Sequence, residues 1–132
     1  MDDQIGQVKK RILVVEDEKP LRDLYVQILV NEGYDVDQAK DGEEALASLS
    51  HGGYDLVLLD IVLPKMDGVV ILKKLRESPP TTPNRAIVVL SNLGQDDVIA
   101  TSISLGVRGY MIKSDYTPDQ VIKQVNYYLD GQ

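Results

Sequence analysis

Apolar residues along this chain follow two patterns that alternate. Short runs rich in leucine and β-branched residues predict strands over 11–16, 56–59, 86–91 and 107–112. A shorter segment of more polar composition, 34–38, predicts a fifth strand. Between them, apolar residues repeat about every 3.6 positions and predict helices that start near 20, 41, 68, 95 and 117. This alternation predicts a parallel sheet with helices on both faces, because right-handed crossovers allow few other arrangements.

The predicted fold class is therefore α/β, a doubly wound five-stranded parallel sheet. The number and lengths of its elements favour the flavodoxin-like strand order 2-1-3-4-5, in which the ends of strands one and three are neighbours. The 132 residues fit one domain. We expect that domain over 10–130, after a flexible N-terminal segment, 1–9.

Local signals set the ends of the helices. Asp41 with Glu44, and Thr117 with Gln120, have the spacing of a capping box. Inward-facing residues of the first helix are predicted to be Leu21, Leu24, Tyr25, Ile28 and Leu29. Those of the third helix are predicted to be Val69, Val70, Leu72 and Leu75.

Composition narrows the classes of function. The formal charge of -7 and the sequence pI near 4.6 give no general attraction to nucleic acid or to an anionic membrane. The chain has no cysteine, which excludes disulfides, thiolate metal sites and cysteine nucleophiles. No window approaches the length of a membrane span. We therefore expect a protein of the reducing cytoplasm.

Polar residues follow the predicted strands at their carboxyl ends, where open α/β sheets bind ligands. These residues are Glu16 and Asp17 after the first strand, Asp60 after the third, Ser91 at the end of the fourth and Lys113 after the fifth. Each alone has an ordinary explanation as a solvated loop, a strand end or a surface lysine. Their joint occurrence on these strands indicates a site.

Three carboxylates in one crevice repel each other. At about 6 Å and an effective dielectric constant near 20, each pair costs roughly 3 kcal/mol, so a cation is expected. Oxygen ligands without nearby histidine or cysteine suit Mg²⁺ or Mn²⁺, which also bind phosphate oxygens. Asp60 would then be the nucleophile that becomes an acyl phosphate, with Ser91 as a donor and Lys113 as a positive charge.

The segments VVEDE, LLDIVLPKMDG, VVLS and GYMIK, in this order and spacing, resemble a response regulator receiver domain of bacterial two-component signalling. The resemblance covers about Lys10 to Leu129. Within this family, the sequence is similar to the single-domain chemotaxis-type regulators. It implies that Asp60 accepts a phosphoryl group from a histidine kinase or phosphotransfer protein in a phosphorelay. It also implies Mg²⁺ bound by Asp17 and Asp60, with Glu16 acting through water and the backbone carbonyl of Val62 as a further ligand.

The resemblance further implies that Ser91 and Lys113 bind phosphoryl oxygens, and that Tyr110 changes rotamer as Ser91 moves. Such a domain catalyses only its own phosphorylation and dephosphorylation. Its fourth helix, fifth strand and fifth helix would bind a downstream effector protein, with Tyr127 or Tyr128 as contacts, and a phosphorylation-dependent dimer is one assembly it implies. Neither direct nucleic acid binding nor membrane binding is expected.

Three features depart from the family pattern. Asn92 follows Ser91 where the family usually has a very small residue, and Ser114 follows the lysine where it usually has proline. We expect a trans Lys113–Ser114 bond, because a cis bond without proline is costly. The loop 78–84 is also long. Apolar Val62 and Leu93 flank the expected phosphoryl site and could exclude water, which predicts slow dephosphorylation.

Three alternatives remain at this point. A pseudo-receiver that keeps the fold without the reaction is favoured only by Asn92 and Ser114. A flavin-binding flavodoxin-like protein would need a phosphate cradle after the first strand, where this chain has the acidic segment EDEKP. A haloacid-type phosphatase would need a second aspartate two residues after the nucleophile, where this chain has Val62.

Overall fold

Five strands and five α-helices alternate along the chain in the computed structural model, which describes residues 8–131. The strands are β1 (Arg11–Val15), β2 (Asp35–Ala39), β3 (Leu56–Leu59), β4 (Ala86–Ser91) and β5 (Gly109–Ile112). The helices are α1 (Lys19–Asn31), α2 (Gly42–His51), α3 (Gly68–Glu77), α4 (Asp96–Ser104) and α5 (Pro118–Asp130). A 3-10 turn, Lys113–Asp115, joins β5 to α5. Residues 1–7 of the predicted flexible segment lie outside the described residues.

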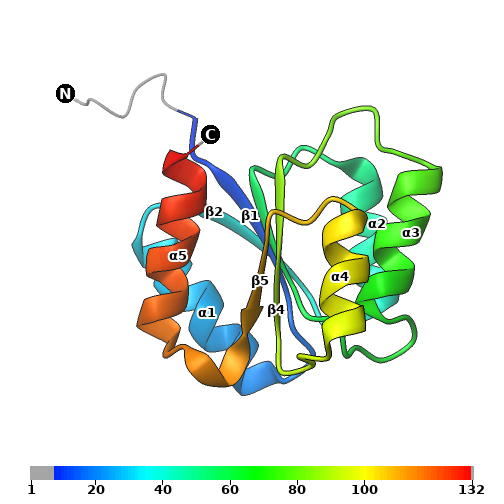
Figure 1. The fold of residues 1–132 in the computed structure, drawn as a ribbon. Coiled ribbons are helices and arrows are strands. Elements are labelled where there is room, and N and C mark those ends of the chain that lie inside the picture. The colour runs from blue at the N-terminus through cyan, green and yellow to red at the C-terminus, as the bar shows by residue number, and fades with distance from the viewer. Residues whose placement is uncertain (1–7, 132) are drawn as a thin grey trace.

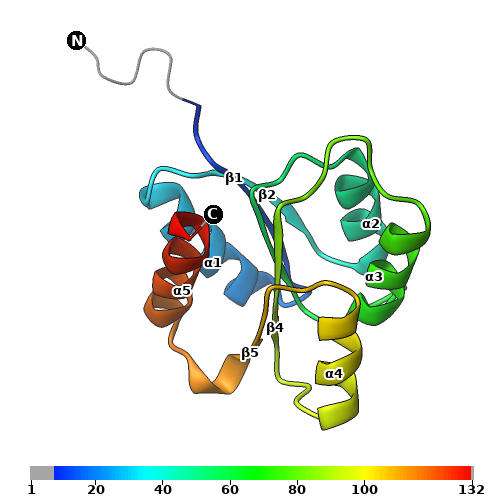
Figure 2. The same cartoon turned by 45° about the horizontal axis from the view of Figure 1, so that its top comes forward.

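All neighbouring strands are parallel, and their order is β2-β1-β3-β4-β5, which confirms the predicted fold class. Helices α1 and α5 cover one face of the sheet, and α2, α3 and α4 cover the other (Figures 1 and 2). The carboxyl ends of the strands all lie at the lower edge of Figure 1. Loops from every strand therefore meet at one edge.

Alternate residues of the central strands enter two separate cores, because successive side chains of a strand point to opposite faces. Ile12 and Val14 of β1 pack with α1 and α5, whereas Leu13 and Val15 pack with α2 and α3. β3 is buried at every position, as predicted for a strand covered on both faces. This rigid double core holds the strand ends in fixed register.

Helical periodicity places two predicted inward-facing residues wrongly. Val70 is 37% exposed, and Ile71 is fully buried in its place, because the buried positions of α3 run 68, 71, 72 and 75. Leu24 is 44% exposed, because the buried face of α1 is formed by Arg22, Tyr25 and Leu29. Arg22 thus occupies a core-facing position that apolar periodicity alone did not assign.

Element ends differ from the prediction by one or two residues. β2 begins at Asp35 rather than at 34, because the Tyr34 N–H donates to the Leu29 carbonyl at the end of α1. β5 begins at Gly109 rather than at 107, because the Val107 N–H donates to Ser102 of α4. Such backbone hydrogen bonds to the preceding helix shorten the strands.

Both predicted capping residues accept the expected N–H. The Thr117 capping box is complete. Asp41 accepts from the Glu44 N–H at 2.9 Å, but the Glu44 carboxylate accepts from the N–H of Lys40 rather than from that of Asp41. The capping box of Asp41 and Glu44 is therefore only half formed.

Candidate functional site

The register of the sheet brings the first two acidic strand ends together. Val15 of β1 is the partner of Leu59 of β3, so Glu16 and Asp60 follow at the same level. The Asp60 N–H donates to the Val15 carbonyl at 3.2 Å and continues the pairing one residue beyond β3. Both carboxylic residues are buried, with exposures of 2% for Glu16 and 4% for Asp60.

Asp60 uses both of its carboxylate oxygens. Oδ1 accepts from the backbone N–H of Val62 at 3.1 Å, and Oδ2 accepts from Lys113 Nζ at 2.7 Å. The first bond is local and fixes the side-chain orientation. The second comes from Lys113 at the start of the turn after β5, whose long side chain has rotatable bonds, so Oδ2 has a partner that can move.

Glu16 is held equally firmly. Its Oε2 accepts from the Glu18 N–H at 3.0 Å, and its Oε1 accepts from Lys113 Nζ at 2.7 Å. Burial raises the pKa of the Glu16 carboxyl above its ordinary value, although the hydrogen bonds from Lys113 and Glu18 act in the opposite direction. Burying this carboxylate costs free energy, which the hydrogen bonds from Lys113 and Glu18 partly offset.

Lys113 forms an ion pair with each of these two carboxylates. Burial by itself would lower the pKa of the Lys113 ammonium, but the hydrogen bonds to Asp60 and Glu16 outweigh burial and raise it above its ordinary value. Lys113 is therefore protonated at neutral pH. It is the positive charge that the cluster of acids requires.

Asp17 completes this cluster from the exposed side. Glu16, Asp17 and Asp60 each place one carboxylate oxygen within 4.8 Å of a carboxylate oxygen of the other two. Hard oxygen donors in this number suit Mg²⁺ or Mn²⁺, which keep several waters when few carboxylates bind them. The donor set therefore fits the cation expected from the sequence.

Arg22, on the buried face of α1, supports the backbone of this cluster and was not predicted as a site residue. Its Nη1 donates to the Glu16 carbonyl at 2.8 Å, and its Nε donates to Gln38 at 3.0 Å. Its spacing is the sequence signal that could have identified it. Arg22 lies three positions before Tyr25 and seven before Leu29, so all three share the buried face of α1. A buried arginine at such a position holds the acidic loop in place.

Ser91 and Tyr110 hold the loop after β4. The fully buried Ser91 accepts from the Leu93 N–H at 3.2 Å, and the half-buried Tyr110 hydroxyl donates to the Leu93 carbonyl. Burial raises the pKa of the Tyr110 hydroxyl, so it remains a donor. The predicted serine and tyrosine thus meet at one loop residue.

The two departures from the family pattern contact each other. The Ser114 N–H donates to Asn92 Oδ1 at 2.8 Å, which joins the loop after β4 to the turn after β5. No cis peptide bond occurs within residues 8–131, so the Lys113–Ser114 bond is trans as predicted.

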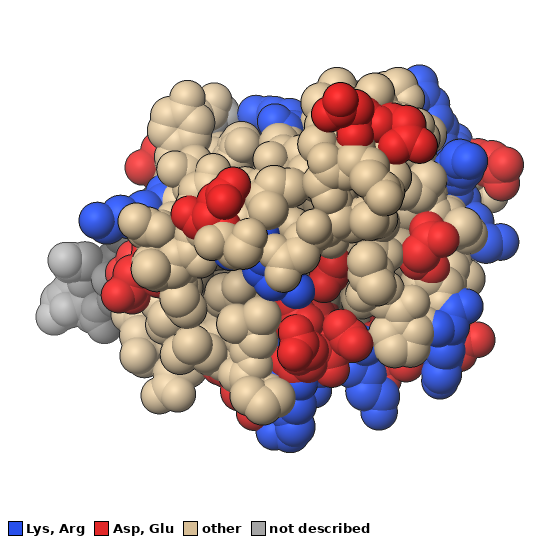
Figure 3. Space-filling model, turned by 60° about the horizontal axis from the view of Figure 1, so that its bottom comes forward, with Lys and Arg blue, Asp and Glu red and all other residues tan. Residues whose placement is uncertain are grey.

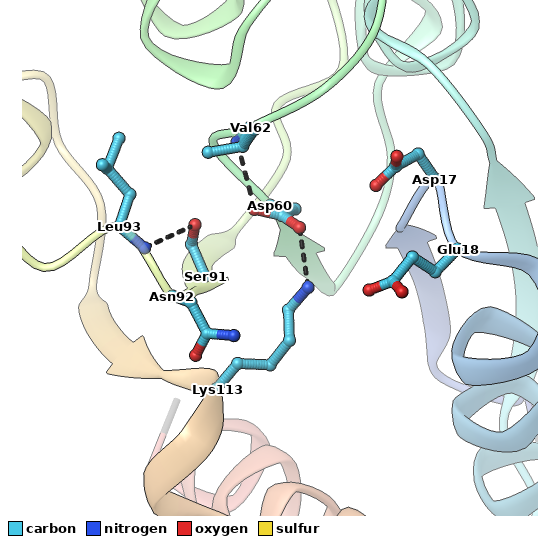
Figure 4. Close-up of a pocket in the computed structure, with 8 residues that line it drawn as sticks. All are labelled: Asp17, Glu18, Asp60, Val62, Ser91, Asn92, Leu93 and Lys113. Carbon is cyan, nitrogen blue, oxygen red and sulfur yellow. Dashed lines mark hydrogen bonds and ion pairs between the residues drawn. The ribbon is translucent and has the colours of Figure 1, made fainter.

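An open cavity of about 440 Å³ lies between these strand ends. Figure 4 shows the eight residues that line it, Asp17, Glu18, Asp60, Val62, Ser91, Asn92, Leu93 and Lys113. Figure 3 views this edge of the molecule and shows acidic side chains gathered below its middle, next to a small basic patch, with both acidic and basic side chains around the rim. The structure therefore brings together every residue that the sequence placed at a strand end.

Residues 12–126 match the family described as the response regulator receiver domain. The chain belongs to this family. Its relatives include the chemotaxis protein CheY of Treponema pallidum, which is 37% identical over 78% of this chain and 72% of its own length. The transcriptional regulatory protein DltR of Streptococcus agalactiae is 38% identical over 87% of this chain, which spans 50% of that protein. This receiver domain thus covers about half the length of such regulators.

Solved structures agree with the family assignment. A CheY-like response regulator receiver domain protein from Methanospirillum hungatei has a TM-score of 0.82 and 29% identity, with 94% of this chain and 96% of that chain covered. A two-component response regulator from Clostridium difficile has a TM-score of 0.79 and 26% identity, with coverages of 92% and 97%. The receiver fold is therefore shared over nearly the whole chain.

Within residues 8–131, none of the helices has the length and apolar character needed to cross a membrane.

Proposed function

We propose that this receiver domain accepts a phosphoryl group on Asp60 from the phosphohistidine of a histidine kinase or phosphotransfer protein, with Mg²⁺ as cofactor. The observation that supports it best is the buried Asp60 carboxylate, paired with Lys113 at 2.7 Å beside Glu16 and Asp17 in an open cavity. The domain then acts as a cytoplasmic switch and turns over no separate substrate.

The transfer begins with Asp60 Oδ2, because its partner Lys113 can follow the incoming phosphoryl oxygens while the Val62 N–H keeps Oδ1 in place. Oδ2 attacks phosphorus, the oxygen–phosphorus bond forms and the phosphorus–nitrogen bond of the phosphohistidine breaks. The electron pair of that bond remains on the imidazole nitrogen of the donor. Lys113 and the Ser91 hydroxyl stabilise the phosphoryl oxygens.

The acidic cluster would hold the metal. Asp17 and Asp60 are the direct carboxylate ligands in this proposal, the Val62 carbonyl is a further ligand, and Glu16 acts through water. When bound, Mg²⁺ offsets the charge of the carboxylates and of the phosphoryl oxygens. Arg22 supports the metal site by holding the Glu16 backbone.

Phosphorylation would then bias the loop after β4. The acyl phosphate adds about one negative charge, because its charge of up to about −2 replaces the single charge of the carboxylate, and it brings new acceptor oxygens. If the Ser91 hydroxyl turns to donate to the phosphoryl group, the Leu93 N–H loses its acceptor and the Tyr110 contact at the same residue can change. This shifts the face formed by α4, β5 and α5 toward its effector-binding or dimeric form.

Dephosphorylation should be slow. Val62 is 59% exposed at the rim of the cavity, and apolar Leu93 lies beyond Ser91, on the side of Asp60 away from Asp17 (Figure 4). Neither side chain can orient a water molecule for attack on the acyl phosphate. A short half-life of the phosphorylated protein would contradict this part of the proposal.

The test is the intact mass of the protein after incubation with acetyl phosphate, with and without Mg²⁺. We expect one phosphoryl adduct that requires Mg²⁺ and that is absent from the Asp60→Asn variant. Binding of fluoroberyllate, which mimics an acyl phosphate without transfer, gives a second readout. Failure of both in the wild-type protein would favour the pseudo-receiver alternative.

A further inference from the structure

The loop after β4 carries an amide side chain whose orientation is fixed by a neighbouring turn. Asn92 Oδ1 accepts the Ser114 N–H at 2.8 Å, across 22 positions of sequence. A backbone N–H can only donate, so the amide oxygen of Asn92 faces Ser114 and its amide nitrogen faces the other way. A proline at position 114 could not form this bond, because proline has no N–H.

The free end of that amide lies at the cavity. Asn92 lines it together with Asp60, Ser91 and Lys113. Figure 4 shows the amide nitrogen of Asn92 on the side of the cavity and the Lys113 stem, whereas the oxygen points toward the turn that begins at Lys113. The cavity wall therefore carries a neutral N–H donor beside the hydroxyl of Ser91 and the ammonium of Lys113.

The Ser114 contact matters because Asn92 is exposed to solvent. An untethered exposed asparagine samples several rotamers, and ordering it on a ligand costs entropy that reduces the benefit of the contact. The loop itself is already held through Leu93, by Ser91 and by Tyr110. With the Ser114 bond in place, the Asn92 amide is orientated before any ligand arrives.

We propose that Asn92 binds a phosphoryl oxygen of phosphorylated Asp60 through its amide N–H groups, and that Ser114 is the positioning residue that orients it. The inference rests on the proposed function and adds a third donor to Ser91 and Lys113. Asn92 also occupies space beside the acyl phosphate that an attacking water would need. The Asn92–Ser114 pair therefore prolongs the phosphorylated state.

The test measures the dissociation constant of fluoroberyllate with saturating Mg²⁺, and the half-life of the acyl phosphate by intact mass. Removing a hydrogen bond to a charged group changes affinity by about tenfold, so we expect Asn92→Ala to weaken fluoroberyllate by about that factor. Ser114→Pro removes the N–H and should act similarly. Ser114→Ala keeps the N–H and is the matched control, within about twofold of wild type by the same argument.

The double variant Asn92→Ala/Ser114→Pro separates a joint action from two independent effects. If the pair acts as one unit, the double variant binds fluoroberyllate no more weakly than either single variant, and the half-life of the acyl phosphate shortens to a similar extent in all three variants. An Asn92→Ala variant that binds like wild type, or additive losses in the double variant, would overturn the inference. Fluoroberyllate binding by the wild-type protein shows in either case that the proposed function still holds.

Ser114→Pro can disturb the turn after β5, which circular dichroism would reveal. In that event Asn92→Leu decides, because leucine keeps the volume of asparagine and removes its donor. A loss of about tenfold in Asn92→Leu supports the donor role. Affinity equal to wild type overturns it.

Discussion

Replacing Lys113 by methionine removes the one positive charge that the structure, over residues 8–131, pairs with the buried carboxylates of Glu16 and Asp60. The Lys113 ammonium lies 2.7 Å from Glu16 Oε1 and 2.7 Å from Asp60 Oδ2, and its side chain is only 11% exposed. Methionine keeps much of the apolar stem and removes the charge. The variant therefore isolates the electrostatic contribution.

The magnitude follows from the distances. The carboxylate oxygens of Glu16 and Asp60 lie within 4.8 Å of each other. At that distance and an effective dielectric constant near 20, their mutual repulsion is about 3 kcal/mol once the ammonium is gone. Breaking a buried ion pair by removing one partner costs about 3–5 kcal/mol, so we expect Lys113→Met to lower the free energy of unfolding by that amount at pH 7 without Mg²⁺.

Urea denaturation followed by circular dichroism measures this loss. Mg²⁺ should restore stability, by about 2.7 kcal/mol at a concentration one hundred times its dissociation constant, because it replaces the missing charge. It should also bind the variant more tightly than the wild type, where the ammonium competes for the same oxygens. Lys123→Met, on the exposed side of α5, is the matched control and should change little.

The pH dependence gives a second check. Burial already raises the pKa of Glu16 above 4.5, and loss of the Lys113 hydrogen bond raises it further. A carboxyl with a raised pKa stabilises the fold most below its ordinary value, and this contribution is lost as the pH rises through the folded-state pKa. The penalty of Lys113→Met should therefore shrink as the pH falls from 7 toward 4.5. Equal stability of variant and wild type at pH 7 without Mg²⁺ would refute the reasoning, as would a penalty that grows in acid.

Three further substitutions test other parts of the fold. Tyr110→Phe removes the donor to the Leu93 carbonyl and should cost about 1 kcal/mol, with faster hydrogen exchange in the loop after β4; unchanged exchange there would contradict the role of this bond. Gly42→Ala would place a Cβ 2.0 Å from the Met66 carbonyl oxygen, so we expect a loss of roughly 1–3 kcal/mol in urea denaturation and slower phosphorylation by acetyl phosphate. Wild-type stability and a wild-type phosphorylation rate would show that the loop carrying Met66 shifts without cost. Thr117→Ala removes the N-cap of α5 and should cost about 1 kcal/mol without changing the phosphorylation rate, which makes a change in that rate the contrary result.

The strand-end residues were predictable because their signals are local. Asp60 directly follows a fully buried strand, and the alternation of elements fixes which strands lie beside it. Glu16, Ser91 and Lys113 follow from the same rule, since parallel strands end at one edge of the sheet. The resemblance to receiver domains rested on these positions, and the family match agrees with it.

Contacts between distant residues were not predictable in the same way. The Arg22 guanidinium lies under the Glu16 loop because its helix turns an arginine toward the sheet, where periodicity suggested Leu24 instead. The Asn92–Ser114 bond depends on the path of two loops, and nothing in either local segment indicates it. Sequence reasoning named both residues as departures but did not relate them.

The sequence by itself determined the order of strands and helices, the parallel sheet and the set of polar residues at its carboxyl edge. Periodicity and capping residues act through backbone geometry within a few positions, so they can be read without a structure. Only the tertiary structure decided which groups pair, as with Lys113, whose partners Glu16 and Asp60 are 97 and 53 positions away. Those pairs depend on strand register and side-chain rotamers, which the packing of both cores fixes together.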